Sequence, residues 1–211
     1  MKRLTTILIS IFFVACNTPD AKQEEDDILQ ALCLNSAEFH FSGYINDEVK
    51  CFSDGLGNYQ RYSGGAIEGH EDPIGVFTMG INTWPLNNGD EAIFINTPKV
   101  DTKNANDVIA KLPIGELPLQ QRQEFHLWYR VIDQIRDVSN MITTELEAKF
   151  DENSAITITE VEKENNDLYD GTTLKVSMTI SCRLYDQDDK MSGSIESASF
   201  TGRIYVNDID D

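Results

Sequence analysis

The sequence predicts a mainly β protein, an antiparallel β-sandwich with at most one or two short helices. The clearest observation is an alternation of apolar and polar residues over residues 173–184. A period of two predicts a strand that buries one face and exposes the other. The even-numbered positions of residues 198–206 repeat an apolar face, and glycine and asparagine turn signals separate such stretches along the chain. A hydrophobic content of 40% in 211 residues gives enough material for one ordinary domain with a sizeable core.

The chain begins with the pattern of a secretory signal peptide. The basic pair Lys2-Arg3 precedes an apolar run over residues 4–14, which is too short to span a bilayer as a mature helix. Ala15 and Cys16 follow, and this order resembles the lipobox of bacterial lipoproteins, in which the cysteine is acylated and becomes the new N-terminus. Phe13 stands where that motif usually has Leu, Val or Ile. We expect residues 1–15 to be removed and Cys16 to be lipidated; the alternative is a plain signal peptide with a coincidental cysteine.

The mature chain divides into a tether and a domain. Residues 16–32 include the run Glu24-Glu25-Asp26-Asp27, which cannot pack, so we expect a flexible acidic tether after the lipidated cysteine. Residues 33–211 are the predicted β-sandwich domain, and residues 28–34 fit a short helix or a strand equally well. Loss of the signal peptide takes the net charge from −19 to −21, which argues against nucleic acid as a partner.

The first hairpin can be read in two registers. Asn46-Asp47 is a turn signal between two alternating runs, the first of which contains Phe41. A three-residue loop turns Cys51 toward the core, whereas a two-residue loop turns Lys50 and Phe52 toward it. We expect the three-residue loop, because it avoids burying the charge of Lys50.

The remaining elements follow from local pattern. Strands are expected at residues 59–62, 77–81, 92–97, 124–133 and 156–161, and a brief helix at residues 107–112, before Pro113. Residues 135–150 are ambiguous, because their apolar positions also fall at helical spacing. We favour strands there as well.

Cysteine and histidine positions give little sign of metal or redox chemistry. Three thiols besides Cys16 allow at most one intramolecular disulfide, and no CxxC or Cys/His ligand spacing occurs, so we expect no metal and no cofactor. Cys182 should point into the core; we expect free thiols, a disulfide to Cys51 remaining the alternative. His40 and His126 fall on the polar faces of strands, where a solvated or hydrogen-bonded imidazole is expected.

The segments Thr-Leu-Lys-Val at 173–176, Ser-Cys-Arg-Leu-Tyr-Asp at 181–186 and Ala-Ser-Phe-Thr-Gly at 198–202 resemble the closing hairpin of uncharacterised β-sandwich lipoproteins of Bacteroidetes. Residues 41–48 are similar to the opening hairpin of that family, with Asp47 where glycine is usual and Lys50 where a large aromatic is common. The resemblance covers roughly residues 155–206. It implies a sandwich and an exported address, and it brings no catalytic residue with it.

No motif points firmly to an enzyme. His70-Glu71-Asp72 places an imidazole beside carboxylates, but it lies between Gly69 and Pro73 and reads as a solvated turn. The aspartates within residues 186–189 could offer oxygens to Ca²⁺, although a charged hairpin tip is the better interpretation. Nucleophile elbows and Ser-His-Asp patterns are absent from the sequence, so we expect no catalytic residues and no enzymatic activity.

We therefore expect an outer-membrane lipoprotein, exposed at the surface or facing the periplasm, with a binding or structural role. Its partners would be the membrane, through the lipid, and a glycan or an envelope protein. One alternative is a surface glycan-binding module, with Trp84 as the best contact, because it precedes Pro85 and opens the turn at residues 87–90. Trp128 lies mid-strand, where packing against a neighbouring strand explains it more easily. Another alternative is an envelope hydrolase such as a glycosidase, which needs two facing carboxylates.

Overall fold

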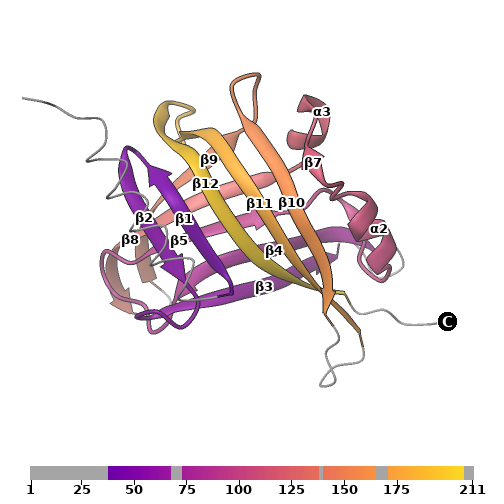
Figure 1. Cartoon of the computed structure of the whole chain (residues 1–211). Helices are drawn as coiled ribbons and strands as arrows, with labels where there is room; N and C mark the ends of the chain where they lie inside the picture. The colour runs from indigo at the N-terminus through magenta and orange to yellow at the C-terminus, as the bar shows by residue number, and fades with distance from the viewer. Residues whose placement is uncertain (1–37, 68–72, 138–139, 165–170, 207–211) are drawn as a thin grey trace, which may run out of the picture.

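The computed structural model describes residues 38–67, 73–137, 140–164 and 171–206. Within these residues the chain forms twelve antiparallel strands and two short helices, which confirms the predicted mainly β, sandwich-like fold (Figure 1). The first layer contains β2 (Glu48–Ser53), β1 (His40–Ile45), β12 (Met191–Val206), β11 (Thr172–Tyr185), β10 (Ala155–Glu164) and β7 (Gly115–Glu116). The second layer contains β9 (Asn140–Lys149), β8 (His126–Asp137), β5 (Glu91–Asn96), β4 (Ile74–Thr83), β3 (Tyr59–Ile67) and β6 (Val100–Asp101).

The two layers join at one corner and lie face to face elsewhere. Residues Arg183 to Tyr185 at the end of β11 pair with the end of β9, so hydrogen bonding runs from one layer into the other. On the far side β12 passes over β4, close enough that a Cβ on Gly202 would lie 2.9 Å from the Cβ of Met79. A side chain at position 202 would therefore force the layers apart there.

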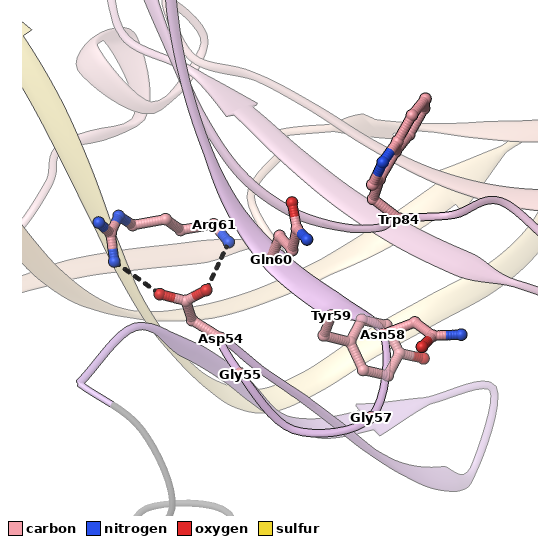
Figure 2. Close-up of a pocket in the computed structure, with 8 residues that line it drawn as sticks. All are labelled: Asp54, Gly55, Gly57, Asn58, Tyr59, Gln60, Arg61 and Trp84. Carbon is pink, nitrogen blue, oxygen red and sulfur yellow. Dashed lines mark hydrogen bonds and ion pairs between the residues drawn. The ribbon is translucent and has the colours of Figure 1, made fainter.

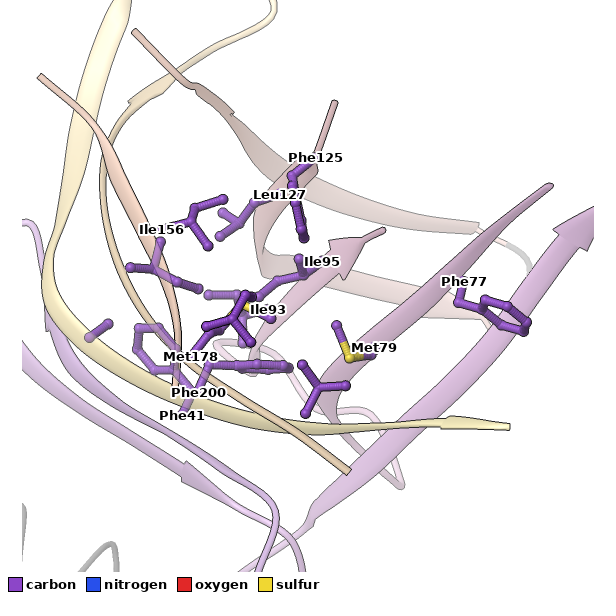
Figure 3. Packing of buried hydrophobic residues seen from close by; sticks show 14 of the residues in the cluster. Phe41, Phe77, Met79, Ile93, Ile95, Phe125, Leu127, Ile156, Met178 and Phe200 are labelled. Atoms are coloured by element: carbon purple, nitrogen blue, oxygen red, sulfur yellow. The ribbon is translucent and has the colours of Figure 1, made fainter. Parts of the chain in front are cut away.

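One hydrophobic cluster fills the space between the layers. Phe41 and Phe200 of the first layer and Met79 and Ile93 of the second are fully buried and lie together in Figure 3. The inward positions of β11 and of residues 198–206 are those that the alternation predicted. Burial of these side chains is the main force that holds the layers together.

A bulge changes the inward face of β12. Ile180 pairs with Ala198 and Cys182 pairs with Ile195, so one extra residue is inserted on β12 at this point. The inserted residue is Ser197, which has a positive φ of 48°. As a result Ile195 points inward together with the even-numbered residues that follow the bulge.

The expected register of the first hairpin is wrong. Ile45 pairs with Glu48, so the loop has two residues, Asn46 and Asp47, and both have positive φ angles of 54° and 63°. Two such residues form the tight turn that matches the twist of paired strands. Lys50 consequently faces inward, and its charge is satisfied there by carboxylates.

The Nζ atom of Lys50 lies 2.8 Å from an oxygen of Glu91 on β5 and 2.9 Å from one of Glu48. The side chains of Lys50 and Glu91 are only 20% and 19% exposed. The hydroxyl of Tyr129 also hydrogen-bonds to Glu91, and burial together with that carboxylate raises the pKa of Tyr129. This inner polar cluster (Glu48, Lys50, Glu91 and Tyr129) links the first layer to the second.

The ambiguous middle of the chain forms strands, as we favoured. β8 and β9 pair over most of their length, with Trp128 opposite Glu147 and Asp137 opposite Asn140. The helices are α2 (Ala105–Ala110) and α3 (Leu119–Arg122), which lie together at one end of the molecule (Figure 1). In the part of the chain that the structure describes, no helix is long and apolar enough to cross a membrane.

Candidate functional site

The second layer carries an aromatic row on the face that points away from the core. Tyr62 on β3 pairs with Gly80 on β4, Gly80 with Phe94 on β5, and Phe94 with Trp128 on β8. Directly opposed residues share a face of the sheet, so Tyr62, Phe94 and Trp128 lie in one line across the strands. We call these three side chains the aromatic row.

The rings of the row contact one another. The centroids of Phe94 and Trp128 lie 5.1 Å apart with planes inclined by 20°, and Tyr62 meets Phe94 edge-on at 5.6 Å. A Cβ on Gly80 would lie only 2.5 Å from the Phe94 ring. The Phe94 ring can occupy this position only because residue 80 is glycine. Phe94 is 5% exposed, whereas Tyr62 is 42% exposed. The row therefore has a fixed centre and accessible ends.

Polar groups surround the aromatic row. The guanidinium of Arg130 lies 5.0 Å from the centroid of the Phe94 ring, and Thr78 and Asn82 stand on β4 nearby. A hollow of about 270 Å³ lies among these groups, lined by Tyr62, Thr78, Asn82, Phe94, Trp128 and Arg130. Among the described residues Arg130 forms no ion pair, and its side chain is one of the groups that border this hollow. We call it the Trp128 hollow.

A second hollow, of about 400 Å³, lies at the end of β4 and contains Trp84 (Figure 2). The backbone N–H of Trp84 donates to the carbonyl of Asn58 at 2.8 Å, which extends the pairing of β3 and β4 by one step. Thr83 is buried, so alternation turns Trp84 to the outer face, where its side chain is 60% exposed. We call this the Trp84 hollow.

The floor of the Trp84 hollow is polar. Arg61 donates from its backbone N–H and from its guanidinium to the carboxylate of Asp54, at 3.1 and 2.7 Å. Figure 2 shows this pair on one side of the hollow and Trp84 on the other, with Gln60 between them. An exposed indole can stack on a flat apolar surface of a ligand. The amide and charged groups beside the indole can then form hydrogen bonds with the polar edges of that ligand.

The two hollows adjoin. Gln60 lines the Trp84 hollow, Asn82 lines the Trp128 hollow, and the two residues are directly opposed in the β3–β4 pairing. Both amides therefore lie on the outer face, Asn82 on β4 between Gly80 and Trp84, and Gln60 beside it on β3. Trp84 and Trp128 are the two tryptophans of the whole chain. The outer face of β3, β4, β5 and β8 thus forms one surface with aromatic groups at both ends and amides between.

An acidic hollow of about 340 Å³ borders the same face, lined by Glu145, Glu147, Asp186, Gln187 and Asp189. The carboxylate of Asp186 accepts hydrogen bonds from the backbone N–H groups of residues 188 and 190 and from the Ser192 hydroxyl. Backbone N–H donation from Lys190, followed by the Ser192 bond, holds the pKa of Asp186 below its ordinary value. Asp186 is therefore engaged in shaping its hairpin tip, as the sequence indicated. Searching the described ranges finds no three His, Cys, Asp or Glu side chains placed to hold a metal ion.

The histidines divide into three cases. His126 lies on the outer face, where its ring is 5.2 Å from that of Trp128 and its Nε2 is 3.4 Å from a carboxylate oxygen of Glu147. His40 is 7% exposed, so of the solvated or hydrogen-bonded imidazole that the sequence predicted, the solvated form is excluded there. His70-Glu71-Asp72 lies outside the described residues.

The cysteines depart partly from expectation. Cys182 is buried and free, as predicted, and burial, with a smaller effect from Asp151, raises the pKa of its thiol to about 12. Cys51 is disulfide-bonded, so the expectation of a free thiol is wrong for this residue. Its partner lies outside the described residues.

Comparisons of the chain with family models, with curated proteins and with solved structures give no match.

Sequence reasoning found Trp84 but missed its neighbours across the sheet. Trp128 does pack against a neighbouring strand, as expected, but it also lines a hollow of its own. Phe94 lies in a continuous apolar run, where no alternation shows that it faces outward. The signal that could have found the row is Gly80 inside a strand, which marks close approach of a neighbouring group.

Proposed function

We propose that the chain is an exported, lipid-anchored protein of the cell envelope that binds glycan on the outer face of its second layer. The lipid on Cys16 would hold it at the outer membrane, and residues 17–32 would let the folded part reach its ligand. The outer-face surface made by the two hollows would be the binding site.

Two features support the exported location. The signal pattern ends in a small residue and Cys16, which is the order that lipoprotein processing requires. Cys51 is disulfide-bonded, and structural disulfides persist in oxidising compartments outside the cytoplasm.

The observation that carries the glycan proposal is the gathering of Tyr62, Trp128 and Trp84 on one exposed sheet face. Sugar rings present apolar faces and polar edges, so they bind to flat aromatics bordered by amides and charged donors. Gln60, Asn82 and Arg130 are donors of that kind on the same face. The surface is built on strands, which hold the contacting side chains in fixed positions for a ligand.

The test is a glycan panel probed with the purified mature chain. We expect binding to at least one polysaccharide, and we expect Trp128→Ala and Trp84→Ala each to weaken it. The matched control is Ile114→Ala, which removes a side chain that is 66% exposed and lines neither hollow. Thermal melting of each variant separates lost contacts from lost structure. Binding that both tryptophan variants retain in full would place the site elsewhere, and an empty panel would refute the proposal.

The anchor has its own test. In cells the wild-type chain should incorporate labelled palmitate and partition into detergent, whereas Cys16→Ala should do neither. Equal labelling of the two chains would contradict lipidation at Cys16.

A further inference from the structure

We propose that the ligand is an extended, uncharged glycan chain that occupies both hollows at once, with Trp84 as its remote contact. This inference rests on the proposed function and deepens it by naming the length and charge of the ligand. The alternative uses of the same face, by a short sugar or by an acidic chain, are outcomes of the test below.

The separation of the two tryptophans sets the length. Trp128 on β8 is opposite Phe94 on β5, and Phe94 is opposite Gly80 on β4, so Trp128 and Gly80 are two strand spacings apart at the same level. Trp84 lies four residues beyond Gly80. Strand spacings of about 4.8 Å and a rise of about 3.4 Å per residue put their backbones roughly 17 Å apart. One sugar ring is about the size of an aromatic side chain, so it cannot touch both indoles. Several linked rings are needed to occupy the whole surface.

The path between the tryptophans is open to a chain. Asn82 lies on this path and Gln60 lies beside it on β3, and each amide can donate to and accept from sugar hydroxyls. Gly80 adds no side chain to this path, and the Phe94 ring lies against that glycine. The ligand would thus run diagonally across β8, β5 and β4.

The charges of the face indicate an uncharged ligand. Arg130 is directly opposed by Glu145 on β9, and Glu147 follows on the same face beside the acidic hollow. Arg61, at the other end, lies on the inner face of β3 opposite the buried Ile81, and its charge is compensated by Asp54. The surroundings are acidic overall, in a chain whose net charge is −19, and a chain of carboxylated or sulfated sugars would be repelled.

The experiment measures affinity against chain length by calorimetry. The probes are cello-, xylo- and manno-oligosaccharides from disaccharide to hexasaccharide, with oligogalacturonate as the acidic series. In a series that binds, we expect the hexasaccharide to bind roughly tenfold more tightly than the disaccharide, which is the effect of one added aromatic contact of about 1.4 kcal/mol. Trp84→Ala should remove that gain, so that the hexasaccharide binds no more tightly than the disaccharide, whereas Trp84→Tyr should restore most of it. Trp128→Ala should weaken both lengths.

Each contrary result has a distinct meaning. Equal affinity for disaccharide and hexasaccharide would overturn the extended site while leaving the glycan proposal standing. A galacturonate series that binds more tightly than the neutral ones would overturn the inferred charge. Absence of binding in every series would refute the proposed function, and the inference would fall with it.

Discussion

Replacement of Lys50 by methionine tests whether the inner polar cluster holds the two layers together. Lys50 is the cation of that cluster, 2.8 Å from Glu91 and 2.9 Å from Glu48. The substitution keeps an unbranched side chain only one atom shorter and removes its charge. It leaves Glu91, only 19% exposed, with the Tyr129 hydroxyl in place of its ion pair.

The magnitude follows from the burial of Glu91. Removing a hydrogen-bond partner from a charged group costs about 1.5–3 kcal/mol, and breaking a fully buried ion pair costs about 3–5 kcal/mol. The pair retains about a fifth of its exposure, so we expect a loss of about 2–3 kcal/mol in the free energy of unfolding. In a chain of this size that lowers the melting temperature by about 4–12 °C.

Urea unfolding followed by tryptophan fluorescence measures this loss. The control is Glu48→Gln, since the Glu48 side chain is 73% exposed and the loss of its ion pair should be much the smaller effect. A double-mutant cycle with Glu91→Gln should return a coupling energy above about 1 kcal/mol. A Lys50→Met protein as stable as the wild type would show that the cluster does not join the layers.

Three further predictions follow. Burial lowers the pKa of Lys50, but the hydrogen bonds and charges of Glu91 and Glu48 together outweigh it, so that the pKa is raised. The stability that Lys50 adds is then complete below pH 10.5 and is lost as the pH rises through the raised pKa, so wild type and Lys50→Met should converge in melting scans above pH 10.5. Cys182 should resist a polar alkylating reagent until the protein is denatured, because it is buried. Fast alkylation of the native protein would show that Cys182 lies on the exposed face of β11. Gly80→Ala should cost about 1–3 kcal/mol, because its Cβ would lie 2.5 Å from the Phe94 ring, and Gly65→Ala, whose nearest contact is 3.4 Å, should cost less in the same urea assay.

The sequence predicted those parts of the fold that depend on local pattern. Alternation over residues 173–184 gave the face of β11 and the burial of Cys182, because a half-buried strand shows its period directly. The ambiguity over residues 135–150 could be resolved only by the pairing of β8 with β9, which joins residues by hydrogen bonds that no local pattern records.

Where the sequence failed, long-range contacts decided. Burying Lys50 looked costly from its neighbours alone, but Glu91, forty-one positions away, supplies the compensating charge. The aromatic row depends on Tyr62, Gly80, Phe94 and Trp128 being brought level by strand register. The sequence predicted that Trp128 packs against a neighbouring strand, but it could not predict which rings would stand beside it.

Nuclear magnetic resonance of the tryptophan indoles tests the binding surface most directly. Trp84 and Trp128 are the two tryptophans of the chain, so a ¹⁵N-labelled protein gives one indole N–H signal for each end of the proposed surface. A neutral hexasaccharide that binds in the panel should shift both signals, and a disaccharide should shift that of Trp128 alone. Saturating glycan that leaves both indole signals unmoved would contradict the assignment of this face as the binding site.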